Sequence, residues 1–233
     1  SASSPGIQAR LVEKGQREIR LLPNGVDLQA FSRPKGDAAM PPDLAAIPEP
    51  RLGDVGSLHP QVDFGLVAKI AEARPTWHVV LVGGSPTLRD SVAEAELRVC
   101  RALPNVHFLG EKSKDEVPQY VSRMNVNLML YRLAAGTWIN SVYPLKLHEY
   151  LAVGRPIVSA DVPAVREFRD VVRIASGLPD WIAAIEDALA TGGKGSPEAR
   201  HAVAAANTWD ARVQQLERWL IQGLASVTST SIK

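Results

Sequence analysis

The stretch YPLKLHEYLAVGRPIVSAD, from Tyr143 to Asp161, predicts a helix, a tight turn and a strand in succession. Pro144 suits the first position of the helix, because proline lacks the N–H group that a helix leaves unpaired there, and Gly154 suits the residue just past its end. The run Ile157-Val158 then predicts a short strand. A helix that leads through a tight turn into a strand is typical of a parallel α/β sheet.

Two charged residues share one face of this otherwise apolar helix. Lys146 and Glu149 are three residues apart, beside the apolar residues Leu147, Tyr150 and Leu151. A cation in the first turn opposes the positive end of the helix dipole, and lysine before glutamate is the weaker order for a helical ion pair. The pair therefore favours the binding of a phosphorylated ligand. The alternative is that the Lys146 side chain extends to solvent and Glu149 merely pairs with it.

Alternating strand and helix patterns run along the chain and predict a parallel sheet with helices on both faces. Short apolar runs predict strands at 53–58, 77–82, 106–109, 126–131, 157–159 and 171–174. Further helices are predicted at 64–73, 88–103, 113–122, 180–190, 197–206 and 209–224. Asp63 can cap the first of them, and Ser113 with Glu116 forms a capping-box pattern. The proline-rich stretch 32–50 is expected to be a long connecting loop.

Composition narrows the class of protein. With 233 residues, 45% of them hydrophobic, the chain is long enough for one well-packed domain. Its 26 basic and 25 acidic residues nearly cancel, so no partner among nucleic acids is expected. Cys100 is the only cysteine, which excludes a disulfide framework and points to a reducing compartment; its apolar neighbours predict a buried thiol. We expect no membrane-spanning helix, because no apolar run reaches roughly 18 residues.

Ligands of open parallel sheets bind beyond the carboxyl ends of the strands, where loops lead into helices. That rule selects segments 56–59, 83–85, 110–112, 131–132 and 143–146. Glycines there let backbone amides approach a ligand, and the helix after Tyr143 offers free amides to a diphosphate. We therefore expect a site for a phosphorylated ligand at this edge of the sheet.

Four stretches, in the same order, resemble the donor-binding half of GT-B glycosyltransferases, in particular bacterial enzymes that build surface polysaccharides. Besides the Tyr143 stretch they are LLPNGVDLQAF at 21–31, GDVGSLHPQVDFGLVAKIAEARPTWHVVLVGG at 53–84 and LPNVHFLGEKSKDEVPQYVSRMNVNLMLY at 103–131. The resemblance implies an α/β fold, a Rossmann-like parallel sheet that forms one half of a GT-B fold, with a helical C-terminus.

The resemblance also implies a division of the chain. Residues 1–17 would be a lead-in segment from an N-terminal half that is missing from this sequence, and 18–207 the Rossmann-like donor-binding domain. Residues 208–226 would form a C-terminal helix, and 227–233 a disordered tail.

The activity that the resemblance implies is that of a glycosyltransferase of the hexosyltransferase type. It would move a sugar from a nucleotide diphosphate sugar, of UDP or GDP type, to a glycan or lipid-linked acceptor in polysaccharide biosynthesis. No cofactor and no metal is expected, because His78, His107 and His148 lack metal-ligand spacing. The full protein would be cytoplasmic and, with a lipid-linked acceptor, would contact the inner face of the cytoplasmic membrane. The fragment alone would bind nucleotide without turnover.

The resemblance assigns roles to the loops. The nucleobase would lie near Gly83, Gly110 and Glu111, and the ribose would be bound by Glu149. The diphosphate would lie near Ser57, Tyr143, Pro144, Leu145 and Lys146. Lys146 would be the catalytic residue, because its ammonium group stabilises the departing diphosphate, with Arg132 as an additional cation.

Several of these assignments have alternatives. His59 fits a phosphate or sugar contact as well as an ordinary loop position, and Glu111 could accept a hydrogen bond from the base or be a solvated charge. Tyr131 and Tyr143 could contact the ligand or cover the core. The sequence also departs from the wider retaining family. Ser141 replaces a frequent glutamate eight residues before Glu149, and 59–63 lacks an arginine and a lysine, so the stereochemical outcome stays open.

Two other functions remain as alternatives. A nucleotide-sugar epimerase can use the same fold, and a non-catalytic α/β binding module would need neither Lys146 nor Glu149. A dinucleotide-dependent dehydrogenase is disfavoured, because the sequence GDVG at 53–56 does not supply the pattern G-x-G-x-x-G.

Overall fold

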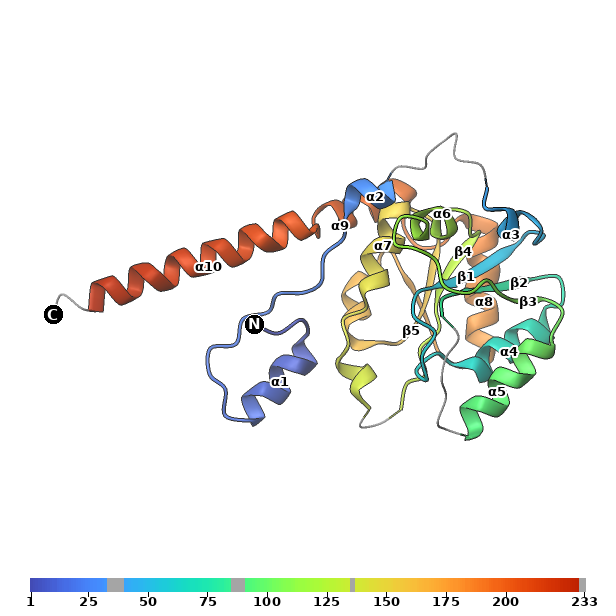
Figure 1. Cartoon of the computed structure of the whole chain (residues 1–233), viewed down its shortest axis with the longest axis horizontal. Helices are drawn as coiled ribbons and strands as arrows, with labels where there is room; N and C mark the ends of the chain where they lie inside the picture. Colours follow the sequence, from blue (N-terminus) through green and yellow to red (C-terminus); the bar gives the residue numbers. More distant parts are fainter. Residues whose placement is uncertain (33–39, 85–90, 135–136, 231–233) are drawn as a thin grey trace.

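The computed structural model describes residues 1–32, 40–84, 91–134 and 137–230, the last six of these by their backbone. Its centre is a six-stranded parallel sheet in the order β3-β2-β1-β4-β5-β6 (Figure 1). The strands are β1 Arg51–Val55, β2 His78–Val82, β3 Val106–Phe108, β4 Val126–Met129, β5 Ile157–Ala160 and β6 Arg173–Ala175. The strand order reverses between β1 and β4, and this switch point is where open α/β sheets bind ligands.

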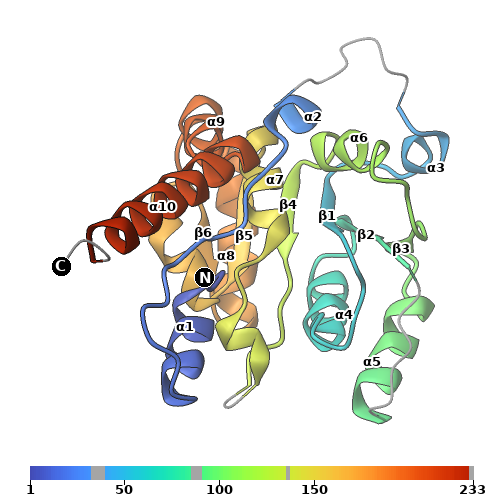
Figure 2. The ribbon, with the colours of Figure 1, turned by 60° about the vertical axis from the view of Figure 1, so that its left-hand side comes forward.

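Helices cover both faces of the sheet (Figure 2). One face carries α4 Phe64–Ala73, α5 Ser91–Ala102 and α8 Gly177–Thr191, and the other carries α2 Leu28–Ser32, α6 Val117–Ser122, α7 Leu145–Val153 and α9 Pro197–Ala205. Outside these layers are α1 Pro5–Glu13, α3 Pro42–Ala45 and the 3-10 helices Trp138–Ser141 and Pro163–Phe168. Helix α10, Trp209–Thr230, extends away from the sheet. The predicted Rossmann-like parallel sheet with a helical C-terminus is confirmed.

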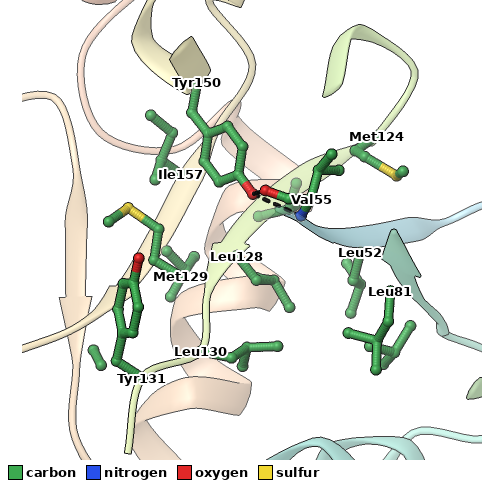
Figure 3. Packing of buried hydrophobic residues seen from close by; sticks show 14 of the residues in the cluster. Leu52, Val55, Leu81, Met124, Leu128, Met129, Leu130, Tyr131, Tyr150 and Ile157 are labelled. Carbon is green, nitrogen blue, oxygen red and sulfur yellow. Dashed lines mark hydrogen bonds between the residues drawn. The ribbon is translucent and has the colours of Figure 1, made fainter. Parts of the chain in front are cut away.

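The core forms where the strands and the apolar helix faces meet. Strand β2 is a valine and leucine run, as expected of a parallel strand buried on both faces. The Tyr150 hydroxyl accepts a hydrogen bond from the Val55 N–H (2.8 Å) and donates one to the Val55 carbonyl (3.1 Å). Figure 3 shows this contact among buried side chains, including Leu128 and Ile157. It ties α7 to the end of β1.

Strong local signals placed several element boundaries correctly. Helix α4 has the predicted limits, and the Asp63 carboxylate caps it by accepting the Leu66 N–H at 3.0 Å. Gly154 ends α7 with φ 78°, a left-handed conformation that favours glycine. The prediction for Pro144 was wrong by one position: its ψ of 127° is extended, so the helix begins at Leu145.

Other boundaries differ more. Glu116 accepts the Ser113 N–H at 2.9 Å, as in a capping box, yet α6 begins only at Val117. The predicted helix start at 88, part of the long loop and residues 231–233 lie outside the described residues. Residues 227–230 of the expected tail belong to α10. Within the expected lead-in segment, residues 5–13 form α1.

None of the helices in the described ranges combines the length and the hydrophobicity that crossing a bilayer requires.

Arg200 of α9 is the largest of the fully buried side chains in the described residues, at 1% exposure. Its guanidinium donates to the backbone carbonyls of Gly154 (2.7 Å), Lys194 (3.1 Å), Gly195 (3.1 Å) and Gly192. One side chain therefore joins the end of α7 to the loop between α8 and α9. Planar guanidinium groups suit this task because their five N–H donors point in fixed directions.

We expect Arg200→Ala to lower the free energy of unfolding by about 3 kcal/mol, since it leaves buried carbonyls without donors and opens a cavity. Urea unfolding followed by tryptophan fluorescence measures this. Arg166→Ala is the control, because that arginine forms an exposed ion pair with Asp161, and it should leave the free energy of unfolding nearly unchanged. Equal losses in the two variants would contradict the role given to Arg200.

Candidate functional site

A buried ion pair lies at the switch point of the sheet. Lys146, in the first turn of α7, reaches the end of β1, where its Nζ donates to the Asp54 carboxylate. Lys146 is 9% exposed and Asp54 is 1% exposed. The other Asp54 oxygen accepts the N–H of Leu130 at 3.1 Å. The carboxylate of Asp54 therefore joins α7, β1 and the end of β4.

The surroundings keep Lys146 charged. Burial opposes the charge, but the adjacent Asp54 carboxylate outweighs this effect, so the pKa of Lys146 is raised. The Tyr131 ring adds a cation–π contact, with its centroid 5.4 Å from Nζ. The alternative in which Lys146 extends to solvent and pairs with Glu149 is wrong, because the lysine is buried and its partner is Asp54.

Glu149 lies one turn further along α7 and is half-buried. Within the described residues its carboxylate has no hydrogen bond and no ion pair. Burial raises the pKa of Glu149, while the positive charges of Lys146 and Lys114 oppose this rise. A half-buried carboxylate without a partner is available to accept hydrogen bonds from ligand hydroxyl groups.

Among the described residues, no side chain caps the N-terminus of α7, and Leu145 at its first position is 55% exposed. Free amides at a helix start attract anions. The side chain of Tyr143, by contrast, is buried in the protein. Its hydroxyl lies 2.7 Å from Nε2 of buried His148, and its carbonyl accepts from Asn24 at 2.7 Å. Of the predicted diphosphate contacts, Leu145 and Lys146 offer amides, whereas the Tyr143 side chain covers the core.

Glycines bring the loops after β1, β2 and β3 together. The Gly56 N–H donates to the Val82 carbonyl and the Gly83 N–H to the Gly110 carbonyl, both at 2.9 Å. A Cβ atom on Gly83 would lie 2.0 Å from the Gly56 oxygen, and one on Gly56 would lie 3.3 Å from Cε of Lys146. Gly83 is therefore required for close backbone approach, and Gly56 leaves room beside the lysine.

Ser57 and His59 follow Gly56. Ser57 is exposed, and His59 is half-buried with its Nδ1 accepting the Gln61 N–H at 3.2 Å. Burial and the positive charge of Lys146 lower the pKa of His59, so its imidazole is neutral near pH 7. His59 can therefore form hydrogen bonds there but supplies no positive charge.

Glu111 is exposed, and the lysine that follows it pairs with a different carboxylate. Lys112 pairs with Asp43 at 2.7 Å. The Glu111 carboxylate lies near Gly84, 3.7 Å from where a Cβ atom on that glycine would be. Glu111 thus adjoins the loop that contains Gly83.

Arg132, which was predicted as an additional cation for the diphosphate, is paired with carboxylates of the protein. Its guanidinium pairs with Asp63 at 3.2 Å and with Glu96, so it is engaged by two carboxylates. Arg132 also lines a pocket of ≈ 490 Å³, together with Asp161 and Lys69. Of the residues predicted to bind the donor nucleotide, Tyr131 lines this pocket as well. The residues that line this pocket include three carboxylates and only two cations. This pocket is therefore electrostatically less suited to a diphosphate than the start of α7.

Sequence reasoning missed two residues and one contact of interest. Asp54 and the Tyr150 hydroxyl organise the end of β1. An acidic residue inside a buried strand was the available signal, because such a charge needs a partner. The structure also brings His78 Nδ1 within 3.0 Å of His107 Nε2. No group of three or more potential metal ligands occurs in the described part of the chain.

Cys100 is fully buried, as predicted. Its thiol donates to the Phe64 carbonyl at 3.0 Å. Burial raises the pKa of this thiol to about 12, so it is protonated and unreactive at neutral pH.

The chain is similar to known proteins in family, sequence and structure. A family model described as "Glycosyl transferases group 1" matches residues 49–191. A Bacillus subtilis (strain 168) protein, named as a candidate teichuronic acid biosynthesis glycosyltransferase, TuaH, is 29% identical over 213 residues. That match covers 88% of this chain and 51% of TuaH, so the chain spans about half the length of this relative.

Solved structures share the fold. Anabaena Alr3699/HepE in complex with UDP and glucose has a TM-score of 0.74 at 17% identity, covering 94% of this chain and 61% of that one. WaaG, a glycosyltransferase involved in lipopolysaccharide biosynthesis, has a TM-score of 0.64 at 17% identity, covering 92% and 60% respectively.

We expect Gly83→Ala to lower the free energy of unfolding by about 1–3 kcal/mol, because its methyl group would force the loops after β1 and β2 apart. Gly84→Ala is the matched control, since a Cβ there meets only an ordinary contact at 3.7 Å. Urea unfolding of both variants measures the difference. If both behave alike, close packing at Gly83 is not required.

His148 should make stability depend on pH. Burial, with a smaller effect of Arg212, lowers the pKa of His148 to about 4, whereas an unfolded histidine titrates near 6.5. The unfolded state therefore binds the proton first, and stability is lost as pH falls from about 6.5 towards 4. In His148→Gln, unfolding free energies measured across this range should fall less steeply with decreasing pH than in the wild type. Parallel profiles would rule out this contribution.

Proposed function

Because the chain belongs to the glycosyl transferases group 1 family, we propose that it is the donor-binding half of a glycosyltransferase. The reaction transfers a sugar from a nucleotide diphosphate sugar to a glycan or lipid-linked acceptor. The observation that carries the proposal is the arrangement on α7. A charged lysine, Lys146, and a carboxylate without a partner among the described residues, Glu149, lie one turn apart beside the uncapped start of α7 at the switch point of the sheet.

The diphosphate binds at the start of α7 in this proposal. Of the three donors of the Lys146 ammonium group, one is directed at Asp54, and the others remain for phosphate oxygens. As the bond between sugar and phosphate breaks, negative charge grows on the departing diphosphate. Fixed amides and the ammonium group stabilise that charge without a proton transfer, which makes Lys146 the catalytic residue.

The nucleoside lies over the glycine loops. Glu149 accepts hydrogen bonds from two ribose hydroxyl groups, and its half-buried position makes each bond stronger than it would be in water. The Gly83 and Gly110 loops, joined by a backbone hydrogen bond of 2.9 Å, flank the base. Glu111 accepts an N–H from the base. Ser57 and His59 are positioned to donate to phosphate or sugar oxygens.

A uridine nucleotide is the proposed donor type. The structural neighbour HepE was solved in complex with UDP and glucose and also with UDP-glucose. The names of TuaH and WaaG place both in polysaccharide synthesis, which supports a polysaccharide acceptor here. The proposed location is the cytoplasm, at the inner face of the membrane where the acceptor is lipid-linked. Cys100 as the only cysteine supports a reducing compartment.

The acceptor binds to a second half that lies outside this sequence. Helix α10 supports this, because one of its faces exposes apolar side chains at helical spacing, between 40% and 63% exposed: Trp209, Val213, Leu216 and Leu220. Monomeric domains rarely expose such a continuous stripe, and a second half would cover it. The chain alone therefore binds nucleotide but transfers no sugar.

Isothermal titration calorimetry with UDP, GDP and their sugars tests the proposal. We expect binding of at least the uridine ligands, and a roughly tenfold loss of affinity in both Glu149→Gln and Lys146→Ala. Glu149→Gln is the cleaner variant, because Lys146→Ala also leaves Asp54 buried without its partner. Lys69→Ala, in the pocket beside Arg132, is the control and should bind as the wild type does.

Three results of the binding experiment would count against the proposal. One is the absence of binding by any nucleotide, and another is wild-type affinity in Glu149→Gln. The third is loss of binding in Lys69→Ala, which would move the site to the pocket beside Arg132. Sugar transfer by the chain alone would contradict the proposed second half.

A further inference from the structure

Asp54 places a carboxylate in a part of the sheet that solvent does not reach. All five residues of β1 are buried, and Asp54 itself is 1% exposed. Replacing a buried ion pair by apolar residues of similar volume is often neutral or stabilising, because the two charges must give up their hydration. The presence of Asp54 therefore needs a reason other than the stability of the strand.

The groups that face the Lys146 ammonium come from four segments. Asp54 lies on β1, His59 in the loop after it, Tyr131 two residues after the end of β4, and Glu149 and Tyr150 on α7 itself. In the described residues, Asp54 is the carboxylate that pairs directly with Lys146. The two tyrosines and His59 are neutral near pH 7, so they do not balance the charge of the lysine.

We propose that Asp54 is the positioning residue of the donor site, which keeps the Lys146 ammonium group charged and fixed beside the start of α7. This inference rests on the proposed function, since it gives the lysine a diphosphate to meet. Asp54 acts only through Lys146 and touches no part of the ligand.

The geometry explains how one carboxylate both fixes the Lys146 ammonium group in place and keeps it charged. A lysine side chain has four rotatable bonds and loses rotamer entropy when it is fixed, so its ammonium group is poorly placed without an anchor. The Leu130 N–H holds one oxygen of Asp54 at 3.1 Å, and the other oxygen receives the ammonium group. Without the carboxylate, burial would favour the neutral amine, which cannot offset the charge of a diphosphate.

The test compares UDP binding by wild-type chain and Asp54→Asn across pH 6.5 to 9.5. We expect the affinity of the variant relative to the wild type to fall at least tenfold over this range, because its lysine loses a proton. Low pH should restore binding. Using the ratio removes the titration of UDP itself. Asp63→Asn, which alters the Arg132 ion pair, is the matched control and should give a constant ratio.

A constant ratio for Asp54→Asn, at whatever affinity, would overturn the proposal and leave Asp54 a structural residue. Failure of the wild type to bind UDP would instead overturn the proposed function, and the positioning role with it. A second measurement needs no folded variant of Asp54. The ¹³Cε signal of Lys146, assigned from its loss in Lys146→Arg, should not titrate below pH 10 in the wild type, and titration below pH 10 would refute the proposal.

Discussion

The ion pair between Lys146 and Asp54 is the contact on which the geometry of the site depends. A buried charge without a partner costs several kcal/mol, so each group fixes the place and the charge state of the other. Through this pair the start of α7 is held against the end of β1, while Tyr150 ties the same two elements by its bonds to Val55. The free amides of α7 and the carboxylate of Glu149 are thereby kept at the switch point of the sheet.

The fold could be predicted because its determinants are local. The apolar run of β2, the Asp63 cap of α4 and the left-handed Gly154 each act within a few residues. The boundaries of helices and strands differ from the predicted ones where contacts between residues far apart in sequence determine them. Strand β1 begins at Arg51, earlier than predicted, because the Arg51 N–H bonds to the Asn125 side chain at 2.7 Å and the strand pairs with β2 from its first residue.

The site could be predicted only in part, for the same reason. Lys146 and Glu149 were identifiable because they share one helix, and their roles stay predictions. Asp54 lies 92 residues before its lysine, so no sequence pattern joins the two. The pairing of Arg132 with Asp63 and Glu96 also joins residues that are far apart in sequence, and it engages a cation that sequence reasoning had assigned to the diphosphate. Long-range charge pairing therefore decides which cations are free to bind a ligand.

A crystal structure of the chain with UDP tests the central claim most directly. It should show the diphosphate at the amides of Leu145 and Lys146 with one oxygen on Nζ, the ribose hydroxyls on Glu149, and the Asp54 contact retained. A nucleotide bound beside Arg132 and Lys69, or a diphosphate remote from the start of α7, would contradict it.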